Sequence, residues 1–291
     1  MKPATFSYAA PRTVEEAIEL LEAYGDDAKV LAGGQSLVPL LNMRLAQPKV
    51  LVDINAVEGF DEIVEEEGFV YVPMRVRHVQ GERSPLLREK LPVVSEAVHQ
   101  IGHPQIRNRG TMCGSVAHAD PASELPAVLM ALDGRIVVKS GDGEEQITPE
   151  DFFLTYLTTS LQPGQLVTAL RFPLLPPNSS AAFVEFAQRP GDFALCGVAA
   201  YLHLDEGGTI AEARLALMGV GGTPFCAEQA EAVLQGERPS AALFAEAAET
   251  VSQEVDPDSD IHASAEYRRH LAKVLIPQAL EMAAARLGEE R

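Results

Sequence analysis

Residues 29–36 read Lys-Val-Leu-Ala-Gly-Gly-Gln-Ser, a short apolar run that passes directly into a glycine pair. The run Lys29–Ala32 predicts a buried strand. Glycine adopts positive φ without strain and lets a ligand approach the main chain, so Gly33–Ser36 predicts a sharp loop with exposed amides. A helix is expected over 37–45, and Gln47-Pro48 ends it before a second buried strand at 49–54.

The segment before this stretch predicts a capped helix. Thr13 and Glu16 have the spacing of a capping box. In this motif the Thr13 side chain accepts a hydrogen bond from the backbone N–H of the third helical residue, and the Glu16 side chain reaches back to a backbone N–H at the start of the helix. Apolar residues recur from Val14 to Leu21 at helical spacing, and Gly25 supplies the stop. The N-terminal residues therefore predict a compact α/β unit.

A second unit follows, in which strands and helices are mixed. Strands are expected at 68–73, 134–139 and 165–172, and helices from Ser84-Pro85, over 92–101 and over 122–132. The stretch 103–121 between them is expected to be mostly loop.

Residues 174–180 (LLPPNSS) are the best candidate for a linker, because two prolines and polar turn formers end the preceding pattern. Beyond it, strands at 182–187, 194–204 and 209–218 precede helices at 224–235, 240–253 and 264–287. A hairpin turn is expected at Glu206-Gly207-Gly208. Strands followed by helices indicate helices packed on one face of an antiparallel sheet.

The composition limits the classes of function. A chain of 291 residues predicts two domains or three small ones. Its formal net charge of −19 argues against nucleic acid and against an anionic membrane surface. Three dispersed cysteines without a C-x-x-C make an iron–sulfur or zinc site in this chain improbable, and no membrane span or signal peptide is evident. We expect a cytoplasmic protein.

Two loops carry the chemistry that the residues themselves suggest. Ala32–Ser36 and Thr111–Ser115 are rich in small residues and neutral donors, which suits a pyrophosphate on an acidic protein. A plain strand-to-helix turn is an equally good interpretation of the first loop. Arg107 and Arg109 either neutralise phosphate or brace the second loop.

Other motifs are absent or incomplete. Neither the dinucleotide fingerprint G-x-G-x-x-G nor the P-loop pattern occurs. Ser115, His118 and Asp120 contain the residue types of a catalytic triad, but three members within one short loop rarely align. One His and one Asp are too few for a metal site, so both are expected to hydrogen-bond the loop.

Five ordered segments together resemble the FAD-binding medium subunit of molybdenum hydroxylases, the group containing carbon monoxide dehydrogenase and xanthine dehydrogenase. They are AGGQSLVPLLNMRL (32–45), QIRNRGTMCGSVAHADPASELPA (105–127), FFLTYLTTSLQPGQL (152–166), RPGDFALCGVAA (189–200) and DSDIHASAEY (258–267). The resemblance covers nearly the whole chain.

The resemblance implies an α+β protein with a vanillyl-alcohol-oxidase (PCMH)-type FAD domain. Two α/β subdomains, 1–57 and 58–175, would precede a C-terminal α+β domain at 178–291, an antiparallel sheet with helices. The two loops would hold the pyrophosphate, Glu124 the ribose or ribityl part, and the Gly-Asp-aromatic motif the border of the flavin ring. The implied FAD contacts are Val30, Leu31, Ala32, Gly33, Gly34, Gln35, Ser36, Leu37, Ile101, Thr111, Met112, Cys113, Gly114, Ser115, Glu124, Leu161, Asp192 and Phe193.

Two positions depart from the pattern of the family. Cys113 stands where a second glycine is usual, so either it adopts negative φ or the loop is adjusted. A covalent attachment of flavin to Cys113 is the alternative to a plain buried thiol. Glu185 stands where some relatives have a lysine, and no role is carried over to it.

The function implied by the resemblance is electron transfer without a catalytic residue or a metal ligand on this chain. A large subunit with a molybdenum cofactor and a small subunit with [2Fe–2S] clusters would be the partners, in a dimer of heterotrimers. The FAD would pass electrons to an external acceptor. The first alternative is a free-standing FAD oxidoreductase, with Tyr156, Asp192 or His203 as the proton-transfer group. The second is a scaffold without flavin.

Overall fold

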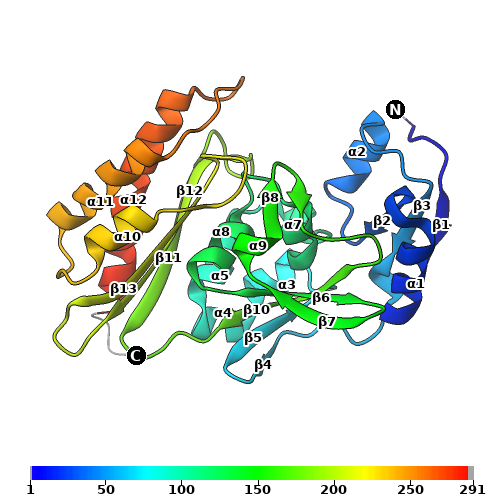
Figure 1. Cartoon of the computed structure of the whole chain (residues 1–291), viewed down its shortest axis with the longest axis horizontal. Helices are drawn as coiled ribbons and strands as arrows, with labels where there is room; N and C mark the ends of the chain where they lie inside the picture. The colour runs from blue at the N-terminus through cyan, green and yellow to red at the C-terminus, as the bar shows by residue number, and fades with distance from the viewer. Residues whose placement is uncertain (1, 288–291) are drawn as a thin grey trace.

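A three-stranded parallel sheet supports the first glycine loop in the computed structural model, which describes residues 2–287. The strand order is β1-β3-β2, so the last strand along the chain lies between the other two. Two helices and two short 3-10 turns complete the unit (Figure 1). The elements are β1 (Ser7–Ala9), α1 (Val14–Tyr24), η1 (Gly25–Asp27), β2 (Ala28–Leu31), α2 (Leu37–Met43), β3 (Val50–Asp53) and η2 (Ile54–Ala56).

The capping residues of α1 behave as the sequence predicts. Thr13 Oγ1 accepts a hydrogen bond from Glu16 N at 3.1 Å, and Glu16 Oε2 accepts one from Arg12 N at 2.7 Å. The apolar residues of the helix, from Val14 to Leu21, are buried against β2 and β3. The start of α1 is therefore fixed by its own side chains, and its orientation by the sheet.

The second unit is built on a five-stranded antiparallel sheet with the order β4-β5-β10-β6-β7. The central strand β10 is buried along most of its length, whereas the edge strands β4 and β7 are mostly exposed and carry glutamates. Charged edge strands discourage pairing with other chains. The strands are β4 (Val64–Glu66), β5 (Phe69–Pro73), β6 (Arg135–Ser140), β7 (Gly143–Ile147) and β10 (Leu166–Pro173).

Seven short helices and a small hairpin pack on this sheet. Every residue of α8 is buried, because the helix lies between neighbouring helices of the second unit and the sheet of the C-terminal part (Figure 1). A helix enclosed on all sides has no polar face, as its sequence ELPAVLMA shows. The elements are α3 (His78–Arg83), α4 (Pro85–Lys90), α5 (Pro92–Gln100), α6 (Pro104–Arg107), α7 (Met112–His118), α8 (Glu124–Ala131), α9 (Pro149–Phe152), β8 (Phe153–Thr155) and β9 (Thr158–Thr159).

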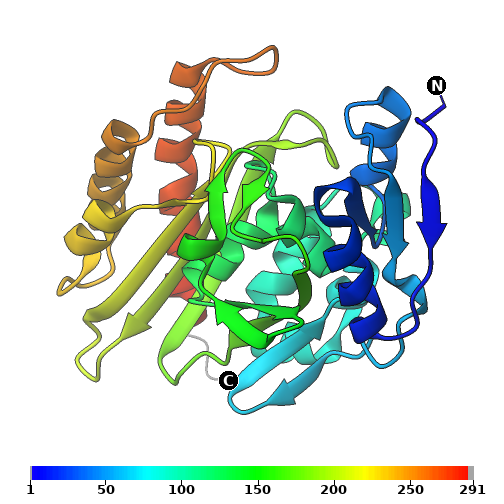
Figure 2. The same ribbon diagram turned by 45° about the vertical axis from the view of Figure 1, so that its right-hand side comes forward.

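The C-terminal part is an antiparallel sheet with the order β11-β12-β13-β14 and three helices on its outer face (Figures 1 and 2). This arrangement confirms the prediction of an α+β chain that ends in an antiparallel sheet with helices. The elements are β11 (Ser179–Ala187), β12 (Ala194–Leu204), β13 (Ile210–Met218), β14 (Phe225–Cys226), α10 (Glu228–Leu234), α11 (Ala241–Glu254) and α12 (Ala265–Leu287).

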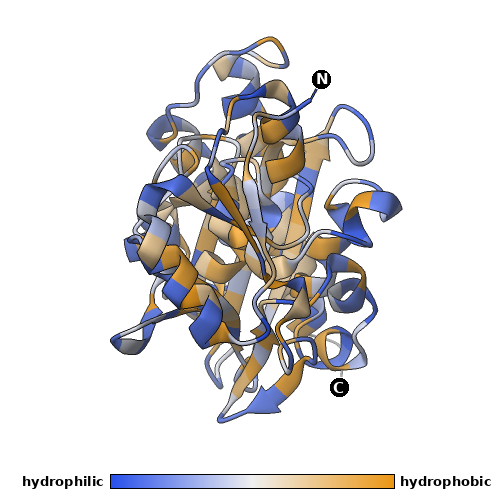
Figure 3. Cartoon of the chain, turned by 90° about the vertical axis from the view of Figure 1, so that its right-hand side faces the viewer, coloured by the Kyte–Doolittle hydropathy of each residue, from blue (hydrophilic) through white to orange (hydrophobic). Residues whose placement is uncertain are grey.

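The two faces of this sheet belong to two different cores. On β11, Ala181 and Phe183 join the core shared with the first two units, while Ala182 and Val184 pack with the core under α10–α12. Alternating side chains point to opposite faces of a strand, so the sheet forms the wall between the two cores. In the view onto the first unit, hydrophobic residues lie along the inner strands, and the outer loops are mostly hydrophilic (Figure 3).

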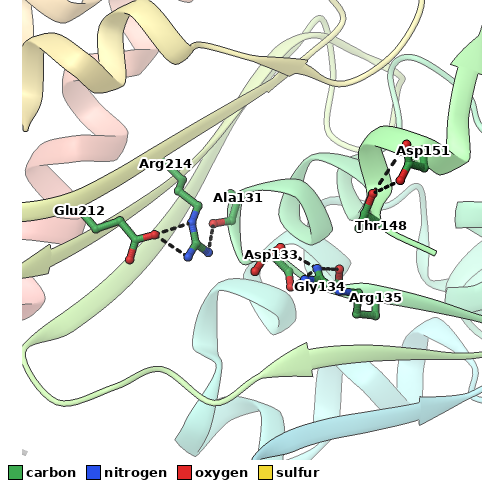
Figure 4. A network of polar contacts seen from close by, with 8 residues as sticks. All are labelled: Ala131, Asp133, Gly134, Arg135, Thr148, Asp151, Glu212 and Arg214. Atoms are coloured by element: carbon green, nitrogen blue, oxygen red, sulfur yellow. Dashed lines mark hydrogen bonds and ion pairs between the residues drawn. The ribbon is translucent and has the colours of Figure 1, made fainter. Parts of the chain in front are cut away.

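Polar contacts fix the C-terminal sheet against the second unit. Arg214 on β13 bonds Glu212 Oε1 at 2.6 Å and reaches Ala131 O at 3.5 Å, at the end of α8 (Figure 4). Arg286 on α12 forms an ion pair with Glu96 on α5 at 2.6 Å. These contacts link the C-terminal part to α5 and to the end of α8.

Several boundaries differ from the sequence prediction for physical reasons. The strands β1, β4 and β7 were missed because edge strands lack an apolar run. The stretch 103–121 is not mostly loop, because α6 and α7 occupy it. The expected linker ends early, since β11 already begins at Ser179, and the helix expected from 224 starts only at Glu228, after β14.

We expect Arg268 to stabilise the C-terminal part strongly. Its guanidinium is buried and donates to Leu195 O at 2.6 Å, to Gly219 O at 3.0 Å and to Asp260 Oδ2 at 2.8 Å. Arg268→Met leaves these acceptors unpaired and should lower the free energy of unfolding by about 2–4 kcal/mol. Denaturant unfolding measures the change.

The neighbouring Arg269 provides the matched control. It bonds Val255 O and the exposed carboxylate of Asp256, so Arg269→Met should cost less than about 1 kcal/mol. Equal losses for the two variants would contradict the structural role of Arg268.

Candidate functional site

The two glycine-containing loops touch each other backbone to backbone. A Cβ atom built at Gly33 would lie 2.5 Å from both Arg109 O and Gly110 Cα, which no side chain tolerates. Gly34 has φ of +70°, a conformation that favours glycine. The glycine pair therefore serves two needs, the close contact with the second loop and the turn of the first loop away from β2.

The first loop presents free amides. Within residues 2–287, the backbone N–H groups of Gly33, Gly34, Gln35 and Ser36 donate to no protein acceptor. The side chain of Gln35 donates to Gly33 O at 2.9 Å and so supports the bend. Consecutive amides without partners form a cradle for an anion. This observation favours a binding loop over a plain turn.

The second loop is the start of helix α7 and not an irregular loop. Thr111 is its N-cap, and its Oγ1 accepts a hydrogen bond from Gly114 N at 3.1 Å. Cys113 lies inside the helix with negative φ, so the missing glycine needs no adjusted backbone. A Cβ at Gly114 would lie 2.6 Å from Thr111 Oγ1, so glycine is required there for the cap.

Asn55 and Arg77 hold the two loops together from behind. Asn55 Nδ2 donates to Ala32 O at 2.9 Å, and Arg77 donates to Asn55 Oδ1 and, through Nη1, to Arg109 O. The network joins both loops to η2 and to the start of α3. Arg107 is a brace as well, since it is buried and bonds Glu82 and the carbonyls of Ile101 and Gly102.

A cavity of about 710 Å³ runs along both loops. Its size is that of a cofactor or ligand site. Residues 162–165 and the first unit border one part of it, and Asp192 and Phe193 border another. The implied contact residues that line it are Val30, Ala32, Gly33, Gly34, Gln35, Ser36, Leu37, Ile101, Thr111, Gly114, Ser115, Glu124, Leu161, Asp192 and Phe193.

Three of the implied contact residues turn away from this cavity. Leu31 lines a separate hollow of about 380 Å³ on the other side of the first loop, together with Asp53 and Arg109. Met112 is fully buried against Gly81, and Cys113 is buried with its Sγ 3.5 Å from Val72 O. Met112 therefore points toward α3 and Cys113 toward β5, and burial raises the pKa of the Cys113 thiol. This geometry argues against a covalent attachment at Cys113.

The residue types of a triad do not assemble. Ser115 Oγ bonds Ser123 Oγ at 2.8 Å, and Asp120 Oδ1 accepts from Ala122 N at 2.9 Å. His118 bonds neither of them in the described part of the chain. Among the candidates for proton transfer, Asp192 lines the cavity, whereas Tyr156 bonds Asp258 and His203 lies on β12 outside it.

Two buried titratable groups line the cavity. Burial lowers the pKa of His78 to about 4, and neither ring nitrogen has a hydrogen-bond partner among the residues that the structure describes. Burial, and then the neighbouring Glu185, raise the pKa of Glu124 to about 8. At neutral pH the imidazole is therefore neutral and Glu124 is mostly protonated.

Sequence reasoning did not identify His78 or the hairpin residue Leu157 as part of the cavity wall. Leu157 has φ of +52° and donates from its N–H to Ala119 O, so a bulky residue is held in a strained backbone conformation at the cavity. His78 is an isolated histidine after an arginine, and neither it nor Leu157 belongs to a sequence pattern that predicts a place in the cavity wall.

Basic side chains at the cavity wall are few. No arginine lines the cavity in the part of the chain that the structure describes, and Lys29 is the lysine that does. No group of three or more His, Cys, Asp or Glu side chains in residues 2–287 is arranged to hold a metal ion. None of the helices in this range is long and apolar enough to span a bilayer.

Comparison with known proteins gives matches over nearly the whole chain. Residues 4–175 match the family described as the FAD binding domain in molybdopterin dehydrogenase, and residues 181–283 match the C-terminal domain of the CO dehydrogenase flavoprotein. The 6-hydroxypseudooxynicotine dehydrogenase complex subunit alpha of Paenarthrobacter nicotinovorans is 42% identical, over 97% of this chain and 96% of its own length.

Two further relatives support the same grouping. The caffeine dehydrogenase subunit beta of a Pseudomonas species is 38% identical over 99% of this chain and 97% of its own length. Among solved structures, a chain of carbon monoxide dehydrogenase from Hydrogenophaga pseudoflava superposes with a TM-score of 0.95 at 34% identity. That match covers 98% of this chain and 99% of the other.

We expect Gly33→Ala to separate the two loops, because the added methyl group would collide with Arg109 O and Gly110 Cα. The collision should lower the free energy of unfolding by about 1–3 kcal/mol. Gly221→Ala is the matched control, because the nearest atom to its Cβ would be Thr223 O at 3.8 Å and its φ is not positive. Thermal unfolding of both variants checks the expectation. A Gly33→Ala variant as stable as the wild type would contradict the close contact between the two loops.

We expect His78 to make the fold sensitive to acid. The pKa of His78 in the folded chain is about 4, below the unfolded value near 6.5. Below pH ~6.5 the unfolded chain therefore binds a proton at this residue, whereas the folded chain binds it only near pH ~4. Stability should fall by about 3 kcal/mol from this residue between pH ~6.5 and ~4.

Unfolding of wild type and His78→Leu at pH 7 and at pH 4.5 measures this difference. The variant should lose less stability on acidification, whereas His262→Gln, an exposed control, should follow the wild type. Equal losses of stability on acidification in the wild type and in His78→Leu would exclude this effect of His78.

Proposed function

Since the chain belongs to the family of FAD-binding medium subunits of molybdenum hydroxylases, we propose that it binds one FAD in the cavity and passes electrons through it. The proposed donor is a [2Fe–2S] cluster of a partner subunit, and the proposed acceptor is an external molecule. The four free amides of the first loop carry the proposal, because they suit a pyrophosphate on a chain of net charge −19.

The residues of the cavity fit such a cofactor. The amides from Gly33 to Ser36 and the hydroxyl of Ser115 would hold the pyrophosphate without a guanidinium. Glu124 would hold the ribose or ribityl part. Asp192 and Phe193 would border the ring, where Phe193 is 73% exposed at the cavity and offers an apolar face.

The redox chemistry belongs to the bound cofactor, and the chain supplies binding, orientation and electrostatics. The buried Ile101 and the half-buried Leu161 would exclude water from one side of the cavity. The neutral state of His78 keeps a positive charge away from the second loop at neutral pH.

The proposed partners are a large molybdopterin-binding subunit and a small iron–sulfur subunit, in a dimer of heterotrimers. The relatives support this proposal, because one of them is a subunit of a dehydrogenase complex and another is a chain of carbon monoxide dehydrogenase.

We further assign residues 1–57, 58–175 and 178–291 as two FAD-binding subdomains and a C-terminal domain. Each contains its own main sheet, and the cavity draws residues from all three. The rival function, a free-standing oxidoreductase, needs a proton-transfer group at the ring, for which Asp192 is the candidate on the cavity wall.

Flavin binding to the purified chain tests the proposal. We expect the chain mixed with FAD to retain it at one per chain after gel filtration and to release authentic FAD on denaturation. Gly33→Ala should weaken FAD binding at least about tenfold, because the cradle loses its shape, while Gly221→Ala should not.

The native complex separates the proposal from its rival. Affinity purification of the chain from its source should yield flavin, iron and molybdenum with two further subunits. Substrate oxidation by the chain with FAD alone would favour the free-standing oxidoreductase, and absence of flavin from both chain and complex would reject both.

A further inference from the structure

Exposed apolar side chains gather at one end of the molecule beside the cavity. They lie on three segments, the hairpin β8–β9, the loop between β11 and β12, and the loop between α11 and α12, which share the upper end of the chain in both views (Figures 1 and 2). Isolated apolar side chains are common on protein surfaces, whereas a group of them marks an interaction site. This end surface consists of Leu154, Tyr156, Leu157, Phe193 and Ile261, which are between 49% and 95% exposed.

Contacts between the segments make them one surface. Tyr156 Oη donates to Asp258 Oδ2 at 2.8 Å, and Gln188 Nε2 donates to His262 O at 3.2 Å. The ring of Tyr156 also covers Gly222, where a Cβ would lie 2.8 Å from Tyr156 Cε2. The hairpin of the second unit and two loops of the C-terminal part are therefore held together, and the end surface spans both units.

Ile261 is held outward by its neighbours. Asp260 Oδ1 accepts hydrogen bonds from His262 N at 2.8 Å and from Ala263 N at 2.9 Å, and its Oδ2 pairs with the buried Arg268 at 2.8 Å. The backbone beside Ile261 is thus fixed, yet its side chain is 95% exposed. A segment that is already ordered loses little conformational entropy when a partner covers it, so Ile261 suits the anchor of an interface.

Carboxylates border the end surface. Asp192, Asp258 and Glu266 are exposed and form no ion pair among residues 2–287, whereas Arg189 is the exposed arginine of the loop between β11 and β12. A partner with an apolar patch and with lysine or arginine side chains around it complements this border. Two copies of the chain that met at this surface would instead bring like charges together.

We propose that the end surface docks the protein that delivers electrons to the cofactor, with Ile261 as its anchor. The partner is an iron–sulfur protein whose docking face carries an apolar patch within a basic border. The inference rests on the proposed function, which sets the flavin ring against Asp192 and Phe193. These two residues and Leu157 line the cavity and belong to the end surface or its border, so a protein seated there covers the ring end of the cavity.

Isolation of the tagged chain from its source, with its bound partners, tests the anchor. We expect the wild type to carry FAD together with iron that shows the visible absorption of [2Fe–2S] clusters. Ile261→Asp should retain FAD but carry at least about tenfold less iron, because a carboxylate does not enter an apolar patch of the partner. Leu45→Asp is the matched control, since Leu45 is 72% exposed next to α2 in the first unit, and it should carry as much iron as the wild type. Thermal unfolding of both variants should match the wild type.

Ionic strength tests the acidic border. Dilution of the purified complex, followed by mass photometry, measures how much of the chain separates from the iron–sulfur protein. Glu266→Lys should weaken the complex at least about threefold at low ionic strength and lower its sensitivity to salt, because an attractive charge is reversed. Glu206→Lys is the control and should match the wild type, since Glu206 is exposed in the turn after β12, at the opposite end of that strand from residues 188–193.

The outcomes separate this inference from the proposed function. If Ile261→Asp and the wild type carry equal iron, or if the wild type carries none, the docking surface is wrong, while bound FAD still supports the proposed flavin site. A wild-type dimer in sedimentation that Ile261→Asp splits would make the surface a contact between two copies and would also overturn the inference. If the chain binds no FAD, the proposed function fails, and the iron that the variants retain still decides where the partner docks.

Discussion

The contact between Gly33 and the backbone of Arg109 and Gly110 is the constraint on which the cavity depends. The loop after β2 and the loop before α7 meet there without side chains between them. The contact joins the first unit to the second, and the hydrogen bond from Arg77 to Asn55 joins them again beside it. The cavity passes along this junction, so its shape follows from how closely two main chains approach.

The polar network behind the loops makes this close approach stable. Arg77 and Asn55 satisfy carbonyl groups on both loops, so the carbonyl oxygens are held on the side away from the cavity while the amides of the first loop stay free. A loop with its acceptors satisfied and its donors unused has a net preference for an anion. The acidic chain thereby gains an anion cradle without a cluster of basic side chains.

The sequence predicts the parts of this arrangement that depend on local patterns. Apolar runs identify the inner strands, the Thr13 cap identifies α1, and small residues identify both loops. Edge strands β4 and β7 were missed because their side chains meet solvent on both faces. Helix α7 was missed because its cap at Thr111 follows a glycine, and only packing shows that Met112 turns toward α3 and Cys113 toward β5. Likewise, His78 joins the cavity through tertiary contact alone.

The position of Glu185 shows that its place along the strand, and not its residue type, decides which face of the sheet its side chain occupies. A glutamate on a strand is expected at the surface, where ionisation costs nothing. Here the sheet is a wall between two cores, so the alternation that places Ala181 and Phe183 inside also carries Glu185 inward. Gly197 leaves space beside it, and burial raises the pKa of the Glu185 carboxyl to about 7. A side chain that would be solvated on an isolated sheet is thus partly buried once the second unit covers that face.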